Sequence, residues 1–184
     1  MAIKWKDASL IGNIPLSGNI RKCLLNTGSL IKHLEYSSSN KILLSVEAQS
    51  WRKPHPDESK LLAVRSSGYS LIREIFLTCN NLPWVYARTI IPPHTLLGAK
   101  RLAYWGKQPL GDYLFSNKLI YRGNIEIAGV KTSNIPYEPI YNLDIDEHNL
   151  LWGRRSIFNI RNKPLLLIEF LLPEAIKCIN SLKK

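Results

Sequence analysis

The chain has 184 residues, of which 45% are hydrophobic, and a formal net charge of +11. This length is enough for a single domain, residues 1–184, with a substantial core. No apolar run approaches the roughly 18 residues of a membrane-spanning helix, and Met1 to Asp7 lack the apolar core of a signal peptide. Three widely spaced cysteines argue against a disulfide framework and a zinc site. We therefore expect a cytoplasmic protein without stable membrane insertion.

The positive charge is compatible with nucleic acid, an acidic surface or an anionic small substrate as partner. The Lys and Arg residues form no run longer than two, and no helix-turn-helix, zinc-finger or aromatic RNA-binding signature accompanies them. A solvated basic surface explains this pattern, so we expect no nucleic-acid partner. Strongly salt-dependent DNA binding would mark the nucleic-acid alternative.

Hydrophobic periodicity divides the first half of the chain into short helices followed by strands. The predicted elements are helices over 19–25 and from Ser29 onward, a strand over 41–49, and strands over 71–79 and 84–91. Ser29 is placed to cap its helix. Residues 51–69 are a polar connection that contains prolines, and residues 80–83 are the four-residue loop of a hairpin.

The second half of the chain continues with alternating helices and strands. The predicted elements are helices over 95–104, 109–115 and 174–184, and strands over 119–127, 155–161 and 164–172. Residues 128–149 are polar and too long for an ordinary connection, so we predict a surface insertion there. Hairpin-linked strands with separate helices indicate an α+β domain with a largely antiparallel sheet of about six strands.

Two apolar strands each carry a charge that would be buried. Leu165 to Leu172 is a continuous apolar run broken only by Glu169, which needs a cationic partner if it is ionised. Arg73 is the best candidate, because alternation places it on the apolar face of its own strand. The two charges indicate either a buried structural ion pair or a small-anion site.

Several segments together resemble the chorismate lyase family, in the family's order. They are Arg73 to Leu77, Pro83 and Trp84, Ala87 to Pro92, Pro109 to Phe115, Leu151 to Ser156, and Lys163 to Pro173. They cover most of residues 70–173, whereas the N-terminal third matches mainly at Gly28 to Leu30. Any one segment alone would be a weak signal, but the set is specific.

The resemblance implies a single α+β domain in which helical flaps cover an internal ligand pocket. It implies conversion of chorismate to 4-hydroxybenzoate and pyruvate, the first step of ubiquinone biosynthesis, with no metal and no organic cofactor. The expected partners are therefore this substrate and its product. We expect a monomer.

The resemblance also assigns roles to individual residues. Arg73 matches the arginine that binds the ring carboxylate, and Glu169 matches the glutamate that meets the ring hydroxyl. Arg88 matches an arginine expected to hold the second carboxylate. These three form the expected catalytic set. Leu30 and Leu110 fall at positions expected to bind substrate through backbone contacts.

Two further interpretations stay open. Ligand-sensing domains of some bacterial transcription regulators share this fold and bind small acids without chemistry, so a non-catalytic binding module is the alternative function. The chain shows no winged-helix segment before the domain, which favours the enzyme. Arg154 and Arg155 are interpreted as structural, because an arginine pair at the start of a strand often binds carbonyls or carboxylates.

Overall fold

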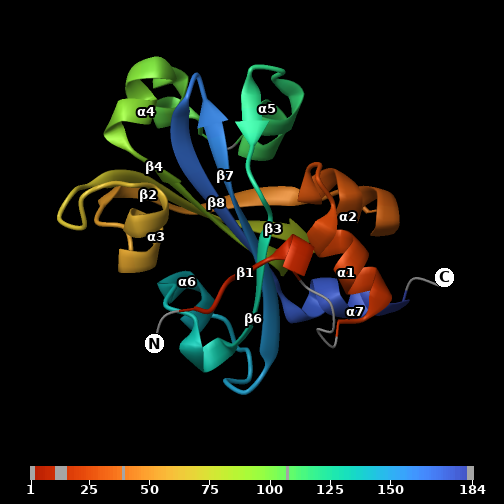
Figure 1. Ribbon diagram of the computed structural model, residues 1–184. Helices are drawn as coiled ribbons and strands as arrows, with labels where there is room; N and C mark the ends of the chain where they lie inside the picture. The colour runs from red at the N-terminus through yellow and green to blue at the C-terminus, as the bar shows by residue number, and fades with distance from the viewer. Residues whose placement is uncertain (1–2, 11–15, 39, 107, 182–184) are drawn as a thin grey trace.

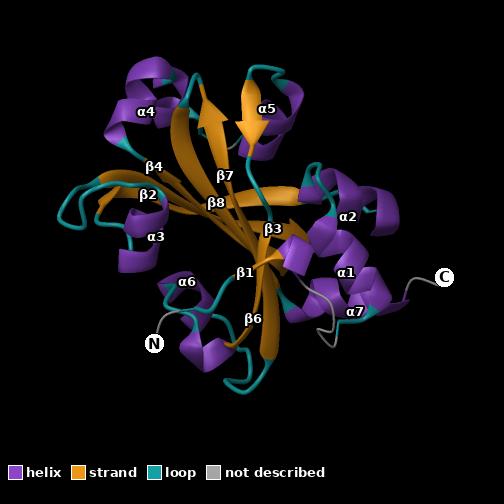
Figure 2. Ribbon diagram, in the orientation of Figure 1, coloured by secondary structure: helices purple, strands orange, loops and turns teal. Residues whose placement is uncertain are grey.

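The structure is a computed structural model that describes residues 3–10, 16–38, 40–106 and 108–181. Within these residues the fold is one α+β domain built on an eight-stranded sheet, and every neighbouring pair of strands is antiparallel. The strands fan out through the centre of the molecule and the helices lie around them (Figure 1, Figure 2). None of the described helices has the length and apolar composition needed to cross a bilayer.

The strands are β1 (Lys6–Asp7), β2 (Leu43–Arg52), β3 (Ser70–Cys79), β4 (Leu82–Ile91), β5 (Ile120–Arg122), β6 (Glu126–Lys131), β7 (Leu150–Ile160) and β8 (Lys163–Leu171). The α-helices are α1 (Gly18–Leu25), α2 (Leu30–Ser38), α3 (Pro56–Leu61), α4 (Pro93–Gly98), α5 (Leu110–Ser116), α6 (Glu138–Tyr141) and α7 (Pro173–Ser181). Three short 3₁₀ helices complete the described elements: η1 (Ala8–Leu10), η2 (Lys100–Tyr104) and η3 (Thr132–Asn134).

Along the sheet the strands follow the order β1-β6-β7-β8-β4-β3-β2, and β5 pairs with β7 beside this path. The predicted antiparallel α+β fold is therefore confirmed, although the sheet has eight strands where the sequence predicted about six. The predicted strand over 119–127 is two strands, β5 and β6, interrupted at residues 123–125. Strand β1 is only two residues long and carries no hydrophobic pattern that could predict it.

The helix predictions are confirmed at both ends of the chain, as α1, α2 and α7, and for α5. Residues 182–184 of the predicted last helix lie outside the described residues. The predicted helix over 95–104 is divided at Ala99 into α4 and η2. The connection over 51–69 contains α3, which is capped by a hydrogen bond from the His55 N–H to the Glu58 carboxylate (2.8 Å).

Two tight turns join the strands of the long hairpins, and in the β3–β4 hairpin the register also shifts by one residue between Leu77 and Thr78. Asn80 and Asn81 join β3 to β4 with φ of 49° and 64°, and Arg161 and Asn162 join β7 to β8 with φ of 49° and 62°. Two successive residues with positive φ are typical of the type I′ turn, which matches the twist of antiparallel strands. The first loop is therefore two residues long instead of four, because residue 82 already pairs with residue 79.

The sheet carries a separate core on each face, because side chains alternate along the long strands. The first core contains Leu71, Ile75 and Leu77 of β3 and is covered by α1, α2, α5 and α7. Figure 1 shows α1, α2 and α7 gathered on this side of the molecule. The second core contains Ile72 and Phe76 of the same strand and is covered by α6.

The segment over 128–149 is not a surface insertion, as the sequence predicted, but part of the second core. It begins within β6 and continues through η3 and α6. Ile135, Tyr137 and Ile140 are almost fully buried, and the Tyr137 ring packs on Tyr86 and Phe170. The error has a simple cause: a few core residues stand singly among prolines and polar residues, so the segment shows no periodicity.

A cluster of buried charges stabilises the second core. Arg88 donates to Glu58 from Nε (2.8 Å) and Nη2 (3.1 Å), and to Glu74 from Nη1 (2.9 Å). Burial alone would raise the pKa of Glu74, but the Tyr86 hydroxyl and the Arg52 and Arg88 guanidinium groups lower it overall. Each of these buried carboxylates therefore has a cationic partner, which is the condition for burying such charges.

Replacement of Arg88 by Ala is expected to lower the free energy of unfolding by about 3–5 kcal/mol, because two buried carboxylates lose their shared cation. Urea unfolding at neutral pH measures this difference. Arg65→Ala removes a guanidinium from an exposed position and, as the control, should change the free energy by less than about 0.5 kcal/mol. A loss below about 1 kcal/mol for Arg88→Ala would contradict a stabilising role for the cluster.

Candidate active site

A small enclosed cavity lies on the first-core face of the sheet, where β3, β4 and β8 meet the first turns of α2 and α5. Its wall is mostly apolar, and the charged side chains among its described lining residues are Arg73 and Glu169. The cavity volume is about 30 Å³, which holds only a few water molecules. Ligand cavities usually measure about 300–1,000 Å³. The structure is therefore a closed state, and the covering helices have to move to admit a ring-sized molecule.

Arg73 lies at one end of this cavity and is only 2% exposed. Its Nη2 donates to the carbonyl oxygens of Gly106 (2.9 Å) and Gln108 (3.1 Å), and its buried Nε has no hydrogen-bond partner. No carboxylate of the described residues forms an ion pair with it. Burial lowers the pKa of this guanidinium, and an anion in the cavity would favour its charged form.

Glu169 lies on β8 and is 7% exposed. Its Oε2 accepts a hydrogen bond from Arg154 Nε at 2.7 Å, and Arg154 is the residue directly opposite on β7. The remaining Arg154 nitrogens donate to the carbonyl oxygens of Asn26 (2.6 Å) and Gly28 (3.4 Å). One guanidinium thus fixes both the carboxylate and the loop that precedes α2.

Strand β4 separates the two charges of the cavity. Arg73 pairs with Thr89 on one side of β4, and Glu169 pairs with Ala87 on the other, and all four residues line the cavity. With neighbouring strands about 5 Å apart, the two backbone positions lie roughly 10 Å apart across the sheet. Arg73 and Glu169 therefore share a dry face, as predicted. The expected pairing of Glu169 with Arg73 is wrong, because Arg154 pairs with Glu169.

Leu30 and Leu110 are the first residues of α2 and α5, and both line the cavity. The N–H groups in the first turn of a helix have no partner within the helix. The structure therefore brings Arg73, Glu169, Leu30 and Leu110 to one cavity. Their substrate contacts stay predictions.

Arg88 does not line this cavity. The expectation that it holds the second carboxylate of the substrate is therefore wrong for this arrangement. Arg88 pairs across the hairpin with Glu74, so it lies on the opposite face of the sheet from Arg73 and Thr89. Its guanidinium is already occupied by Glu58 and Glu74. The residue is structural in this arrangement.

Arg122 connects both covering helices to the sheet. Its Nη1 donates to the carbonyl oxygens of Asn26 (3.3 Å) and Thr27 (2.9 Å), in the loop between α1 and α2. Its guanidinium also lies 5.4 Å from the ring centre of Phe115, which belongs to α5 and lines the cavity. Burial, with the nearby Arg154 charge, lowers the pKa of Arg122 to about 10. The loop before α2 is thus fastened by two arginines.

Sequence reasoning missed two polar residues of this region. Arg154 was interpreted as structural, although in a hairpin with a two-residue turn after Ile160 it falls directly opposite Glu169. Ser29 was interpreted only as a helix cap, but it lines the cavity and its buried Oγ has no hydrogen-bond partner. The register of the β7–β8 hairpin is enough to place Arg154 opposite Glu169. That Ser29 lines the cavity is visible only in the tertiary structure.

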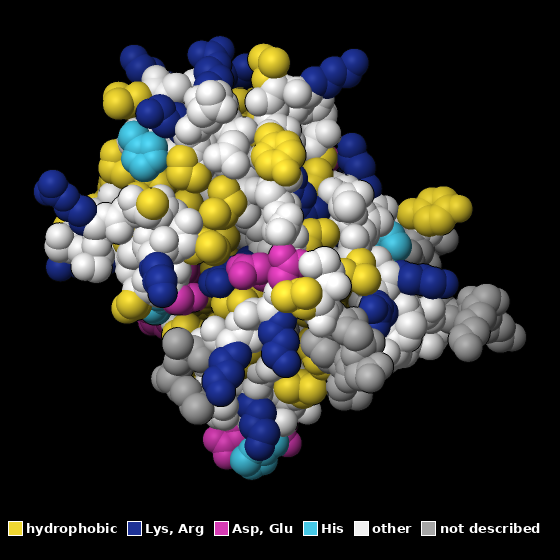
Figure 3. Space-filling model, viewed as in Figure 1, with side chains coloured by type: hydrophobic (Ala, Val, Ile, Leu, Met, Phe, Trp, Pro, Cys, Tyr) yellow, Lys and Arg dark blue, Asp and Glu magenta, His cyan; other side chains and the backbone are white. Residues whose placement is uncertain are grey.

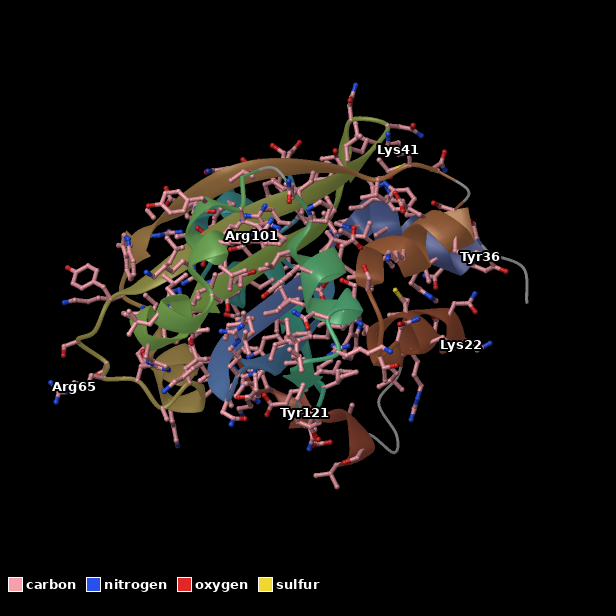
Figure 4. The ribbon with its side chains drawn as sticks, turned by 90° about the horizontal axis from the view of Figure 1, so that it is seen from above. Lys22, Tyr36, Lys41, Arg65, Arg101 and Tyr121 are labelled. Atoms are coloured by element: carbon pink, nitrogen blue, oxygen red, sulfur yellow. The ribbon has the colours of Figure 1, made fainter. Side chains whose placement is uncertain are left out.

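The surface charge is dispersed. On the face shown in Figure 3, Lys and Arg side chains are scattered among hydrophobic and neutral groups. Lys22, Lys41 and Arg65 extend outward from the edge of the molecule (Figure 4). A concentrated basic stripe, the usual footprint of nucleic-acid binding, is not seen on the face in Figure 3.

A sequence profile described as "Chorismate lyase" matches residues 2–178. The chain belongs to the chorismate lyase family. A relative from Methylococcus capsulatus is 35% identical over 155 residues, covering 84% of this chain and 94% of its own, and one from Shewanella loihica is 31% identical over 182 residues, covering 98% and 93%. Both are named probable chorismate pyruvate-lyase.

Solved structures with the same fold include a repressor domain and PhnF. The C-terminal domain of the histidine utilization repressor from Pseudomonas syringae has a TM-score of 0.56 and 12% identity, covering 73% of this chain and 94% of that domain. PhnF from Mycobacterium smegmatis has a TM-score of 0.58 and 13% identity, covering 82% of this chain and 66% of PhnF. At these identities the likeness establishes the family's fold alone.

Arg154→Ala is expected to lower the free energy of unfolding by about 3–5 kcal/mol, because it leaves Glu169 buried without a cation. The double variant Arg154→Ala/Glu169→Gln should recover part of this loss, since no ionised carboxylate then remains. Urea unfolding of the wild type, both single variants and the double variant gives the coupling energy. If the losses in the free energy of unfolding of the two single variants simply add up in the double variant, the pairing with Arg154 is not what stabilises the buried Glu169 carboxylate.

Proposed function

We propose that this chain is a chorismate pyruvate-lyase that eliminates pyruvate from chorismate to give 4-hydroxybenzoate, as the first step of ubiquinone biosynthesis. The observation that carries the proposal is a closed apolar cavity with a buried arginine, unpaired among the described residues, at one end and a buried glutamate at the other. Chorismate is a ring acid with a hydroxyl at C4, opposite its ring carboxylate. The two ends of the cavity match these two groups.

Arg73 is proposed to bind the ring carboxylate. A guanidinium is a planar donor suited to two-pronged recognition of a carboxylate, and Arg73 Nε is free to take part. The N–H group at Leu110 adds a backbone donor for this carboxylate at the start of α5, and the N–H group at Leu30 is a further proposed donor to the substrate at the start of α2. The ring carboxylate would thereby neutralise a buried cation that no described carboxylate pairs with.

Glu169 is proposed to accept a hydrogen bond from the C4 hydroxyl. This contact would orient the C4 hydrogen toward the methylene carbon of the enolpyruvyl group. The C4–H bond and the C3–oxygen bond break, a C–H bond forms at the methylene, and the departing oxygen becomes the keto group of pyruvate. The reaction is redox-neutral and makes the ring aromatic, so the proposal includes no organic cofactor and no metal. Its acceleration comes from holding the reactive conformer.

The proposal includes a monomer in the cytoplasm. Cys23, Cys79 and Cys178 are free thiols, which supports a reducing compartment. Burial raises the pKa of the Cys23 thiol to about 12, so this residue is unreactive at neutral pH.

The direct test is to mix the purified protein with chorismate and to follow 4-hydroxybenzoate and pyruvate separately. Equimolar formation of both products, above the rate with heat-inactivated protein, is the expected result. Binding of 4-hydroxybenzoate without turnover of chorismate would overturn the proposal and leave a small-acid-binding module of the same fold.

Arg73→Ala is expected to reduce kcat/KM by more than about 100-fold, because a two-pronged charged contact in a dry site is lost. Far-ultraviolet circular dichroism should show an intact fold. Arg65→Ala, at the exposed edge of the molecule, is the control and should retain wild-type kinetics. Unchanged kinetics in Arg73→Ala would remove the proposed anchor.

Glu169→Gln is expected to lower kcat by about 10²–10⁴-fold, because the neutral amide is a weaker acceptor for the C4 hydroxyl. Steady-state kinetics at neutral pH separate this effect from any change in KM. A kcat within about threefold of the wild type would make Glu169 a passive contact.

A further inference from the structure

The proposed substrate carries a second carboxylate, on its enolpyruvyl side chain, for which the described residues that line the cavity offer no second arginine or lysine. Arg73 is the cation among the described residues that line the cavity, and it is proposed above for the ring carboxylate. Arg88 lies behind the sheet and is fully paired. The second carboxylate therefore has to be bound by neutral donors of the cavity wall.

Ser29 provides such a donor. The residue is 7% exposed, lines the cavity, and has a buried Oγ without a hydrogen-bond partner. A Cβ built on Gly111, at the start of α5, would lie 3.6 Å from this Oγ, so the hydroxyl lies where the two covering helices meet. A serine before a helix normally caps it by accepting a backbone N–H. Here the hydroxyl forms no such hydrogen bond, and a buried polar group without a partner is a candidate for binding a ligand.

Ser29 also lies at the appropriate end of the cavity. Arg154 bonds Glu169 and the Gly28 carbonyl with the same guanidinium, which places the start of α2 beside the glutamate. Arg73 is bonded instead to Gly106 and Gln108, before α5. In chorismate the C4 hydroxyl and the ether oxygen are on neighbouring ring carbons. A substrate whose C4 hydroxyl meets Glu169 therefore directs its enolpyruvyl group toward α2.

We propose that Ser29 Oγ, together with the N–H groups in the first turn of α2, binds the enolpyruvyl carboxylate. This inference rests on the proposed function and identifies a specificity-determining residue of that site. Helix α2 has nine residues, and the first hydrogen bond at its start runs from the His33 N–H to the Ser29 carbonyl. The preceding N–H groups are free within the helix, and the helix dipole favours an anion there.

The contact distinguishes the substrate from the aromatic product. The enolpyruvyl carboxylate leaves with pyruvate, so 4-hydroxybenzoate retains the Arg73 and Glu169 contacts and loses the Ser29 contact. Removal of the hydroxyl should therefore weaken binding of chorismate and leave binding of 4-hydroxybenzoate unchanged. A purely structural serine would affect both molecules alike.

The experiment compares Ser29→Ala and Ser29→Gly with the wild type, using chorismate as substrate and 4-hydroxybenzoate as inhibitor. Both variants should lower kcat/KM for chorismate by about 10–100-fold, mainly through KM, as expected for a lost hydrogen bond to a charged group. The inhibition constant of 4-hydroxybenzoate should stay within about twofold. Ser59→Ala is the matched control, because Ser59 is 2% exposed with an unpartnered Oγ on α3, outside the cavity lining.

Three results would overturn the inference. They are an unchanged KM in both variants, an equal weakening of 4-hydroxybenzoate, or an effect in Ser29→Ala that Ser29→Gly lacks. The last would implicate the helix start, since Gly replaces Ser there with little loss of stability. Ser29→Gly carries the test alone if Ser29→Ala does not fold. If the wild-type protein does not turn over chorismate, the proposed function itself is refuted. This outcome differs from the three above, in which the wild-type protein is active.

Discussion

The contact between Arg154 and Glu169 is the interaction on which the candidate site depends. An ionised carboxylate inside an apolar strand is stable only with a partner, and Arg154 provides one from the neighbouring strand. The same guanidinium holds the backbone before α2. The strand that carries the proposed catalytic carboxylate and the helix that covers it therefore share one anchor.

Two buried arginines, one on each face of the sheet, have different kinds of partner. On the second-core face the buried carboxylates Glu58 and Glu74 both pair with Arg88. On the cavity face Arg73 has only carbonyl oxygens for partners among the described residues. Consecutive residues of one strand, Arg73 and Glu74, thus belong to opposite environments. The buried Arg88 of one face is paired with carboxylates, and the buried Arg73 of the other has no carboxylate partner among the described residues.

The run of apolar residues and the alternation along the strands correctly predicted which residues are buried and which share a face of the sheet. The run from Leu165 to Leu172 is a strand buried on both faces, and Arg73 shares a face with Ile75, as alternation indicated. The prediction for Arg88 rested on the resemblance, and the register of the β3–β4 hairpin places this residue on the second-core face instead. The two-residue turn at Asn80 and Asn81 is followed by a one-residue register shift between Leu77 and Thr78, and the two together set Arg88 opposite Glu74.

Other parts of the structure have no local signal at all. The Tyr137 ring is covered by residues distant in the sequence, among them Tyr86 and Phe170, so nothing within residues 128–149 could reveal its place in the core. The Ser29 hydroxyl is similar, since its lack of a partner is a property of the assembled cavity. The resemblance located the cavity residues Arg73 and Glu169, but the neighbours of these residues came from the tertiary structure.

Arg122 contacts the backbone before α2 and the Phe115 ring of α5 with one planar group. A displacement of either helix disturbs the same guanidinium, so the two covers are expected to swing as a single gate. Substrate entry and product release would then depend on the same joint movement of α2 and α5, with a single relaxation time. The residence time of a product inside would then be set by the frequency of that shared motion and not by the chemistry beneath it.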